Sequence, residues 1–159
     1  MNSRKLSAFF LALLATVLLA GAARAQEEMA EEEASLYDRL GGLPAISAVV
    51  NDFIDILVPD EFINQNEAVA AARDRVPPAY LKYQVTAMVC QATGGPCTYT
   101  GLGMDEAHAH LAITGAEWDR MVEIFLDVLA KYQVPEAETN ELVAIVATTK
   151  DAIVIGDSE

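Results

Sequence analysis

The sequence predicts an all-α domain. Apolar residues recur at three- and four-residue spacing along most of the chain, and helix-capping residues stand where these patterns begin and end. Strand signals are almost missing, since even the β-branched stretch 152–155 continues a helical line. About 125 residues follow the N-terminal leader, which is enough for one modest hydrophobic core and too few for two domains.

The first expected helix is short, and a long helix follows it. Ser35 can cap residues 36–40, and Gly41-Gly42 ends that segment. The next helix begins at Pro44, a favourable first-turn residue, and ends at Pro59. Its inward face is expected to contain Ile46, Val49, Val50, Phe53, Ile54 and Leu57.

The middle of the chain contains a loop and a third long helical pattern. Residues 60–66 are expected to form a loop or a single helical turn, and 68–72 are rich in alanine. Pro77-Pro78 introduces the next helix, which Gly94-Gly95 ends. Its inward face is expected to contain Leu81, Val85, Met88, Val89 and Ala92.

Two further helices complete the domain. Thr114 and Glu117 form a capping box for a helix that reaches Tyr132, and Pro135 opens the last helix. Taken alone, their apolar stripes indicate the core of a helical bundle. The expected inward residues are Trp118, Met121, Val122, Phe125, Val128, Leu129 and Tyr132 in the first helix and Leu142, Ile145, Val146, Thr149 and Ile153 in the second.

The N-terminus has the three zones of a secretory signal peptide. Arg4 and Lys5 precede an apolar run, and the small-residue sequence Ala23-Arg24-Ala25 follows it, so we predict cleavage after Ala25. An uncleaved anchor is the alternative, but the run is short for a span of about 20 residues. The expected organisation is a signal peptide over 1–25, an acidic flexible leader over 26–34 and one helical domain over 35–155, exported to the periplasm or the cell exterior.

The protein is strongly acidic. The full chain has ten Lys and Arg against 24 Asp and Glu, and cleavage would remove three of the ten basic residues and no acidic one, which changes the net charge from −14 to −17. Such a charge disfavours nucleic acid and anionic membranes as partners and favours solubility. We therefore expect no stable membrane association after cleavage, and a solvated acidic surface.

Cys90 and Cys97 are the two cysteines of the chain. They flank Gly94-Gly95-Pro96, and the export signal predicts an oxidising compartment, which favours a disulfide between them. Two free thiols or a redox-active pair are the alternatives, although the CxxC spacing of redox motifs is absent.

The stretch GGPCTYTGLGMDEAHAHL, residues 94–111, sets a glycine-broken loop before a short helix. Met104, His108 and Leu111 share one face of that helix, and His110 is rotated by roughly 200° from His108. The two histidines therefore cannot join Glu106 in binding one divalent ion. Alone, His108 has two interpretations, a core histidine bonded to a backbone carbonyl or a metal ligand.

The order of motifs resembles that of the group I truncated haemoglobins over residues 35–154. The similar segments are SLYDRLGG at 35–42, the helix that ends near Phe53, GGP, YTG at 99–101, and Met104 followed by Ala107-His108. The resemblance implies a two-over-two helical sandwich around a haem. It also implies that His108 is the proximal ligand of the haem iron, for which neutral imidazole is well suited.

The resemblance also implies which residues contact the haem. The chain has no CxxCH motif, so the haem is expected to be non-covalent haem b. The expected contacts are Met104, Ala107 and Leu111 on the side of His108, Phe125, Ile145 and Tyr99 at the walls, and Phe53, Ile54, Leu81, Gln84, Val85 and Met88 on the opposite, distal side.

Two positions depart from the family pattern. Ile54 occupies a position where the family commonly has a tyrosine, and residues 65–67 stand where it usually has a phenylalanine, which Phe62 could replace. Gln84 is the one polar distal residue; it either reaches the ligand or a haem propionate or lies at the edge of the stripe, and we favour the edge. An apolar distal pocket should release oxygen about tenfold faster than a tyrosine-bearing one.

The sequence thus supports an exported haem protein that binds oxygen, nitric oxide or carbon monoxide. Nitric oxide dioxygenase-type activity would require an external electron donor, because no flavin or nicotinamide motif is present. The alternative is a haem-free acidic periplasmic module, for binding or interaction, that kept the globin frame.

Overall fold

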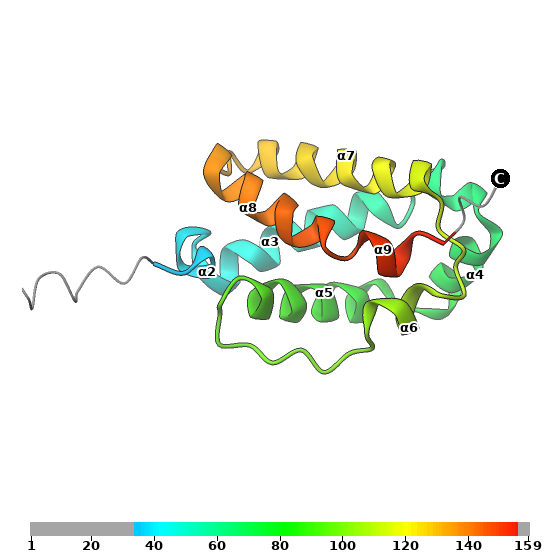
Figure 1. Ribbon diagram of the computed structural model, residues 1–159, viewed down its shortest axis with the longest axis horizontal. Helices are drawn as coiled ribbons and strands as arrows, with labels where there is room; N and C mark the ends of the chain where they lie inside the picture. The colour runs from blue at the N-terminus through cyan, green and yellow to red at the C-terminus, as the bar shows by residue number, and fades with distance from the viewer. Residues whose placement is uncertain (1–33, 156–159) are drawn as a thin grey trace, which may run out of the picture. The chain divides into compact units, whose positions relative to one another are not determined.

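The computed structural model describes residues 34–155, so the predicted signal peptide and the leader up to residue 33 lie outside the described residues. All regular elements in this range are helical, which confirms the all-α prediction (Figure 1). They are α2 (Leu36–Arg39), α3 (Gly42–Leu57), the 3-10 turn η1 (Ile63–Gln65), α4 (Glu67–Arg75), α5 (Pro78–Ala92), α6 (Met104–His108), α7 (Gly115–Lys131), α8 (Glu136–Ala147) and α9 (Lys150–Ile153).

The long helices form two packed layers. The helix α3 packs on α5 and α7, the short α2 joins α3 to α8, and α6 packs on α9 (Figure 1). One core cluster joins α3 to α5, and a second joins α2, α7 and α8. Their buried members are Ile46, Val50 and Ile54 in the first cluster and Leu36, Leu129 and Leu142 in the second.

The predicted helix caps are present. The Ser35 hydroxyl accepts a hydrogen bond from the backbone N–H of Asp38 at 3.1 Å. Thr114 and Glu117 form the reciprocal capping box at the start of α7. The sequence analysis missed a third cap, Asn66, whose side-chain oxygen accepts from the backbone N–H groups of Ala68 and Val69 in the first turn of α4. Each cap satisfies N–H groups that have no partner within the helix.

Two predicted inward positions and one predicted helix start are wrong. Ala92 is exposed, while Cys90 on the same helix is completely buried. Tyr132, just after α7, is exposed, whereas Ile124 in the middle of that helix is buried although it was not predicted to be. The helix α3 begins at Gly42 rather than Pro44. A stripe defined by spacing alone does not show which of its flanks a neighbouring helix covers.

The last predicted helix is divided in two. It ends at Ala147, α9 resumes at Lys150, and Val154 then leaves the helical line. Val154 forms an isolated parallel bridge with Ile113, and the N–H of Ile155 donates to the Ile113 carbonyl at 3.1 Å. The chain end is thereby tied to the segment between α6 and α7, so the expected continuous helix through 152–155 is wrong.

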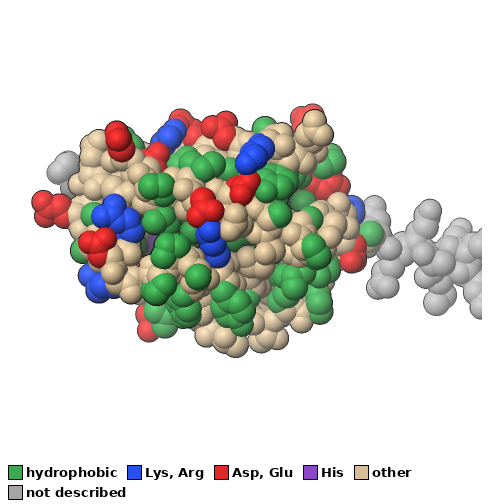
Figure 2. Space-filling model, turned by 180° about the vertical axis from the view of Figure 1, so that it is seen from behind, with side chains coloured by type: hydrophobic (Ala, Val, Ile, Leu, Met, Phe, Trp, Pro, Cys, Tyr) green, Lys and Arg blue, Asp and Glu red, His purple; other side chains and the backbone are tan. Residues whose placement is uncertain are grey.

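Paired charges join the layers. Asp52 on α3 accepts hydrogen bonds from Lys131 at 2.7 Å and from the Tyr132 hydroxyl at 2.8 Å, and these bonds lower the pKa of Asp52 to about 2. Burial alone would raise the pKa of Asp60, but the guanidinium of Arg120 and hydrogen bonds from the backbone N–H groups of Ile63 and Phe62 together lower it. Acidic side chains also lie beside basic ones on the face shown in Figure 2.

Within residues 34–155, no helix is long and apolar enough to cross a membrane.

Candidate functional site

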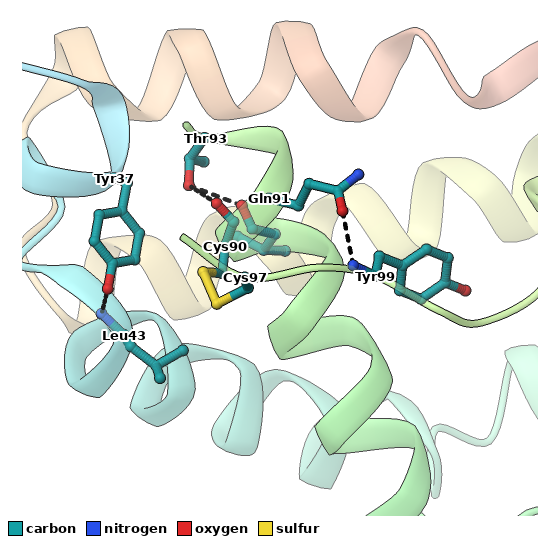
Figure 3. The surroundings of a disulfide bond; sticks show 8 residues. Tyr37, Leu43, Cys90, Gln91, Thr93, Cys97 and Tyr99 are labelled. Atoms are coloured by element: carbon teal, nitrogen blue, oxygen red, sulfur yellow. Dashed lines mark hydrogen bonds between the residues drawn. A yellow bond between two sulfur atoms is a disulfide. The ribbon is translucent and has the colours of Figure 1, made fainter. Parts of the chain in front are cut away.

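The two glycine pairs of the sequence meet at one aromatic ring. The hydroxyl of Tyr37 accepts from the N–H of Leu43, just after Gly41-Gly42 (Figure 3). The same ring covers Gly95, where an added Cβ would lie 2.4 Å from a ring carbon and 2.8 Å from the Cys90 carbonyl oxygen. A side chain at position 95 would therefore push the ring away. The Tyr37 N–H also donates to the Thr93 carbonyl at 2.8 Å.

The predicted disulfide between Cys90 and Cys97 is present, and it bridges α5 to the loop that leads toward α6 (Figure 3). The two Cα atoms lie 5.7 Å apart, a usual separation for a disulfide. The bond closes a tight turn in which Gly94 has a φ of +87°, a conformation that glycine adopts without steric cost.

The YTG motif lies in the same loop, which bends at Gly101. The Tyr99 hydroxyl donates to the Leu102 carbonyl at 2.8 Å, and its ring lies directly over Gly101. The Tyr99 N–H donates to the side-chain oxygen of Gln91 on α5 at 2.7 Å (Figure 3). Tyr99 thus shapes the path of the chain toward α6, a role that only the structure makes visible.

His108 is the last residue of α6 and its ring is oriented by the helix itself. The ring Nδ1 lies 2.8 Å from the carbonyl oxygen of Met104, one turn earlier. Because a carbonyl only accepts, Nδ1 carries the proton in the neutral imidazole, and Nε2 keeps a free lone pair. No residue of the range 34–155 bonds to Nε2. His108 is half-buried, and His110 is exposed.

The helices α5 and α6 follow each other in the chain but have different principal neighbours, which are α3 and α9 respectively. The predicted contacts on the two helices share one property, since all of them are half-buried rather than buried. These residues are Leu81, Gln84, Val85 and Met88 on α5, and Met104, Ala107, His108 and the following Leu111. Between them they offer a mostly apolar surface with one imidazole.

Gln84 is half-buried, with one end of its amide buried and the other bonded to the exposed Tyr80. Its side-chain oxygen Oε1 is buried and has no hydrogen-bond partner, whereas Nε2 donates to the Tyr80 hydroxyl at 2.8 Å. Gln84 precedes Gln91 by two helical turns, so it lies on the side of α5 that faces the loop to α6. If the amide rotates by 180° about its terminal bond, the Tyr80 hydroxyl donates to Oε1 and the NH₂ group, a donor, takes the buried position.

Four predicted contacts belong mainly to the core. Ile54 is 1% exposed and lies in the cluster against which Leu81 and Val85 pack. Phe53 meets Phe125 edge to face, with 5.6 Å between ring centroids, and Phe125 and Ile145 pack on the second cluster. An apolar cavity of about 50 Å³ lies beside Phe125, between the two clusters.

Phe62 and Asn66 lie on either side of η1, in the region where the sequence departs from the family pattern. Phe62 is 43% exposed, so its side chain is not packed into the core. Asn66, in the stretch where the family usually has a phenylalanine, donates through Nδ2 to the Leu111 carbonyl at 2.9 Å. Asn66 therefore links the start of α4 to the segment after His108. An asparagine before an alanine-rich helix is a cap signal that could have identified it.

The structure brings no other metal-binding set together. Within residues 34–155, no group of three or more His, Cys, Asp or Glu side chains converges on one point. His108 is thus a single imidazole on an apolar surface. Such a group suits a metal whose other ligands come from a macrocycle rather than from the protein.

A family model described as bacterial-like globin matches residues 35–155. The chain belongs to this family. More narrowly, it is a group I truncated haemoglobin, similar to the Group 1 truncated hemoglobin GlbN of Mycolicibacterium paratuberculosis, with 28% identity over 80% of this chain and 89% of the relative. The GlbN of a Synechocystis species is 32% identical over 70% of this chain and 88% of the relative.

Solved truncated globins agree with this assignment. The truncated hemoglobin of Tetrahymena pyriformis is 25% identical, with a TM-score of 0.66 over 76% of this chain and 98% of the other. The 2/2 hemoglobin of Synechococcus sp. PCC 7002, solved with a covalently attached heme, reaches a TM-score of 0.67 over the same shares. The predicted two-over-two helical fold is therefore confirmed, and the family is one of haem-containing, gas-binding globins.

The unpaired amide of Gln84 leads to a stability prediction. Replacing it with Leu removes a buried polar atom that has no partner and keeps a similar volume. We expect Gln84→Leu to stabilise the haem-free chain by about 1 kcal/mol in chemical denaturation. Gln91→Leu is the matched control, since it removes the acceptor of the Tyr99 N–H and should destabilise the chain. A less stable Gln84→Leu chain would show that Oε1 is satisfied.

Proposed function

We propose that this globin is an exported b-type haem protein that binds a diatomic gas, with His108 as the protein ligand of the iron. Bound haem iron supplies the coordination position at which oxygen, nitric oxide or carbon monoxide binds. The bond from His108 Nδ1 to the Met104 carbonyl carries the proposal. It leaves Nε2 as a lone-pair donor and fixes the plane of the ring, as is usual for ligating histidines.

The other residues around the site fit the same group. The predicted contacts on α5 and in residues 104–111 are half-buried and mostly apolar, as suits contact with a flat macrocycle. Apolar area removed from water contributes about 25 cal/mol per Å² to binding. Among the predicted contacts on α5, Gln84 is the one polar side chain, and its buried, unpaired atom gives the site a hydrogen-bonding atom.

We propose that the haem is attached non-covalently, because no cysteine of the chain is free to bond to it. The chain has no CxxCH motif, and both of its cysteines are used in the disulfide. A Synechococcus relative is solved with a covalently attached heme. In this chain the second histidine, His110, is exposed and turned away from the face of His108. Haem b, extractable into acidified organic solvent, is therefore the form that we propose.

Haem ligation is tested with the two histidines as a matched pair. We expect the wild-type chain and His110→Ala to give a Soret band after reconstitution, and His108→Ala to give a shifted or much weaker band. An unchanged spectrum for His108→Ala would refute the proposed ligand. No Soret band in any of the three proteins would instead support the haem-free helical module.

Gln84 is also expected to influence gas release. An inward NH₂ that donates to a polar diatomic ligand contributes about 1–1.5 kcal/mol. We therefore expect Gln84→Leu to release oxygen roughly tenfold faster in stopped-flow experiments. Carbon monoxide release should change less, because that ligand is less polar. Tyr80→Phe serves as the control that keeps the amide and removes its outer partner. Equal oxygen release from wild type and Gln84→Leu would mean that the amide makes no such bond.

Export is the remaining part of the proposal. It is supported by the basic pair at Arg4 and Lys5, the apolar run and Ala23-Arg24-Ala25, and it suits a protein whose two cysteines form a disulfide. We expect the mature protein to begin at Gln26 when the full chain is produced in a bacterial host. N-terminal sequencing of the secreted or periplasmic fraction measures this, and an intact Met1 would contradict it.

A further inference from the structure

The segment between α5 and α6 carries the histidine helix but has few connections of its own. From Pro96 to Gly103, the described residues provide two links to α5: the disulfide at Cys97 and the hydrogen bond from Tyr99 to Gln91. The bond from the Tyr99 hydroxyl to Leu102 lies within the segment itself. The position of this segment relative to α5 therefore depends on two neighbouring tethers (Figure 3).

The preceding turn is held without the disulfide. The Gly95 N–H donates to the Cys90 carbonyl at 2.8 Å, and the Gly94 N–H to the Gln91 carbonyl at 3.1 Å. Thr93 is buried and accepts from Tyr37, whose ring covers Gly95. Opening the disulfide would thus leave residues 93–95 in place. Its effect would fall on the chain beyond Pro96, which leads to α6.

The helix α6 is fixed on its opposite side. It packs on α9, and Asn66 bonds the Leu111 carbonyl just beyond His108. With the disulfide open, a single hydrogen bond would join the incoming segment to α5. The helix would then be loosened at its N-terminal end, where Met104 orients the imidazole, and would not be released as a whole.

We propose that the Cys90–Cys97 disulfide is a haem-retention clamp, which fixes the position of the His108 helix relative to α5 and slows haem loss. The inference rests on the proposed haem function. Cys90 and Cys97 are positioning residues, because they act through the loop rather than by touching the haem. The clamp couples haem retention to the compartment, since the disulfide persists only under oxidising conditions.

Opening the clamp is a two-electron reduction. A dithiol reductant attacks one sulfur through its thiolate and forms a mixed disulfide, and its second thiol then displaces the protein sulfur. The S–S bond of the protein is broken, both cysteines become thiols with two protons gained, and the reductant becomes a cyclic disulfide. The reverse exchange with an oxidised dithiol closes the clamp again.

The test measures haem transfer from the reconstituted protein to an excess of an apoglobin scavenger. Cys97→Ala is the informative variant, because Cys97 is half-buried whereas Cys90 is fully buried and its loss would leave a cavity. Thr98→Ala, at the neighbouring exposed position, is the matched control. We expect haem loss to be on the order of tenfold faster in Cys97→Ala and in dithiol-reduced wild type, and unchanged in Thr98→Ala.

A second measurement does not require the haem. Hydrogen exchange of the haem-free chain should become faster on reduction for amides 97–108 and stay unchanged for amides 79–92 of α5. Adding the dithiol to Cys97→Ala should change neither exchange nor haem loss.

The outcomes separate this inference from the proposed function. Equal haem loss from oxidised and reduced wild type, with a normal Soret band, overturns the clamp alone. Unchanged exchange at 97–108 on reduction also overturns it, because the loop would then be held by other contacts. A chain that takes up no haem in either thiol state overturns the proposed function together with the clamp.

Discussion

The fold depends on how the chain is fastened where α5 ends. There Tyr37 lies over Gly95, donates its N–H to the Thr93 carbonyl and accepts the Leu43 N–H with its hydroxyl. One side chain thus joins the start of α3 to the end of α5, the two helices that share the first core cluster. The contact requires a glycine at position 95, because any Cβ there would overlap the ring.

These contacts of Tyr37 at the end of α5 also determine where the chain places His108. After the glycine turn, the chain is held by the disulfide at Cys97, continues past Tyr99 and enters α6. There the Met104 carbonyl accepts a hydrogen bond from Nδ1 of His108. Each step leaves the next little conformational freedom. An imidazole oriented in this way loses less entropy on binding a metal than a freely rotating one. In this part of the chain, the residues that hold the fold together therefore also position the imidazole.

The polarity of the surroundings of the site depends more on how the helices pack than on which residue types the sequence contains. Ile54 belongs to the packed α3–α5 interface, so a larger side chain there would meet a filled core. Gln84 has one amide atom buried without a partner although its position suggested an edge residue. A buried unsatisfied polar atom costs folding free energy, and such costs are often found where a ligand later supplies the missing bond.

The sequence alone determined the local features: the helices, the Ser35 and Thr114 caps, the disulfide pair and the face shared by Met104 and His108. Spacing and capping act within a few residues, so they can be read along the chain. Tertiary structure decided the rest. The Ile113–Val154 bridge, the inward amide of Gln84 and the link from Asn66 to Leu111 join residues from separate helices or depend on them. Burial depends on which helix covers a face, and the spacing within one helix does not contain that information.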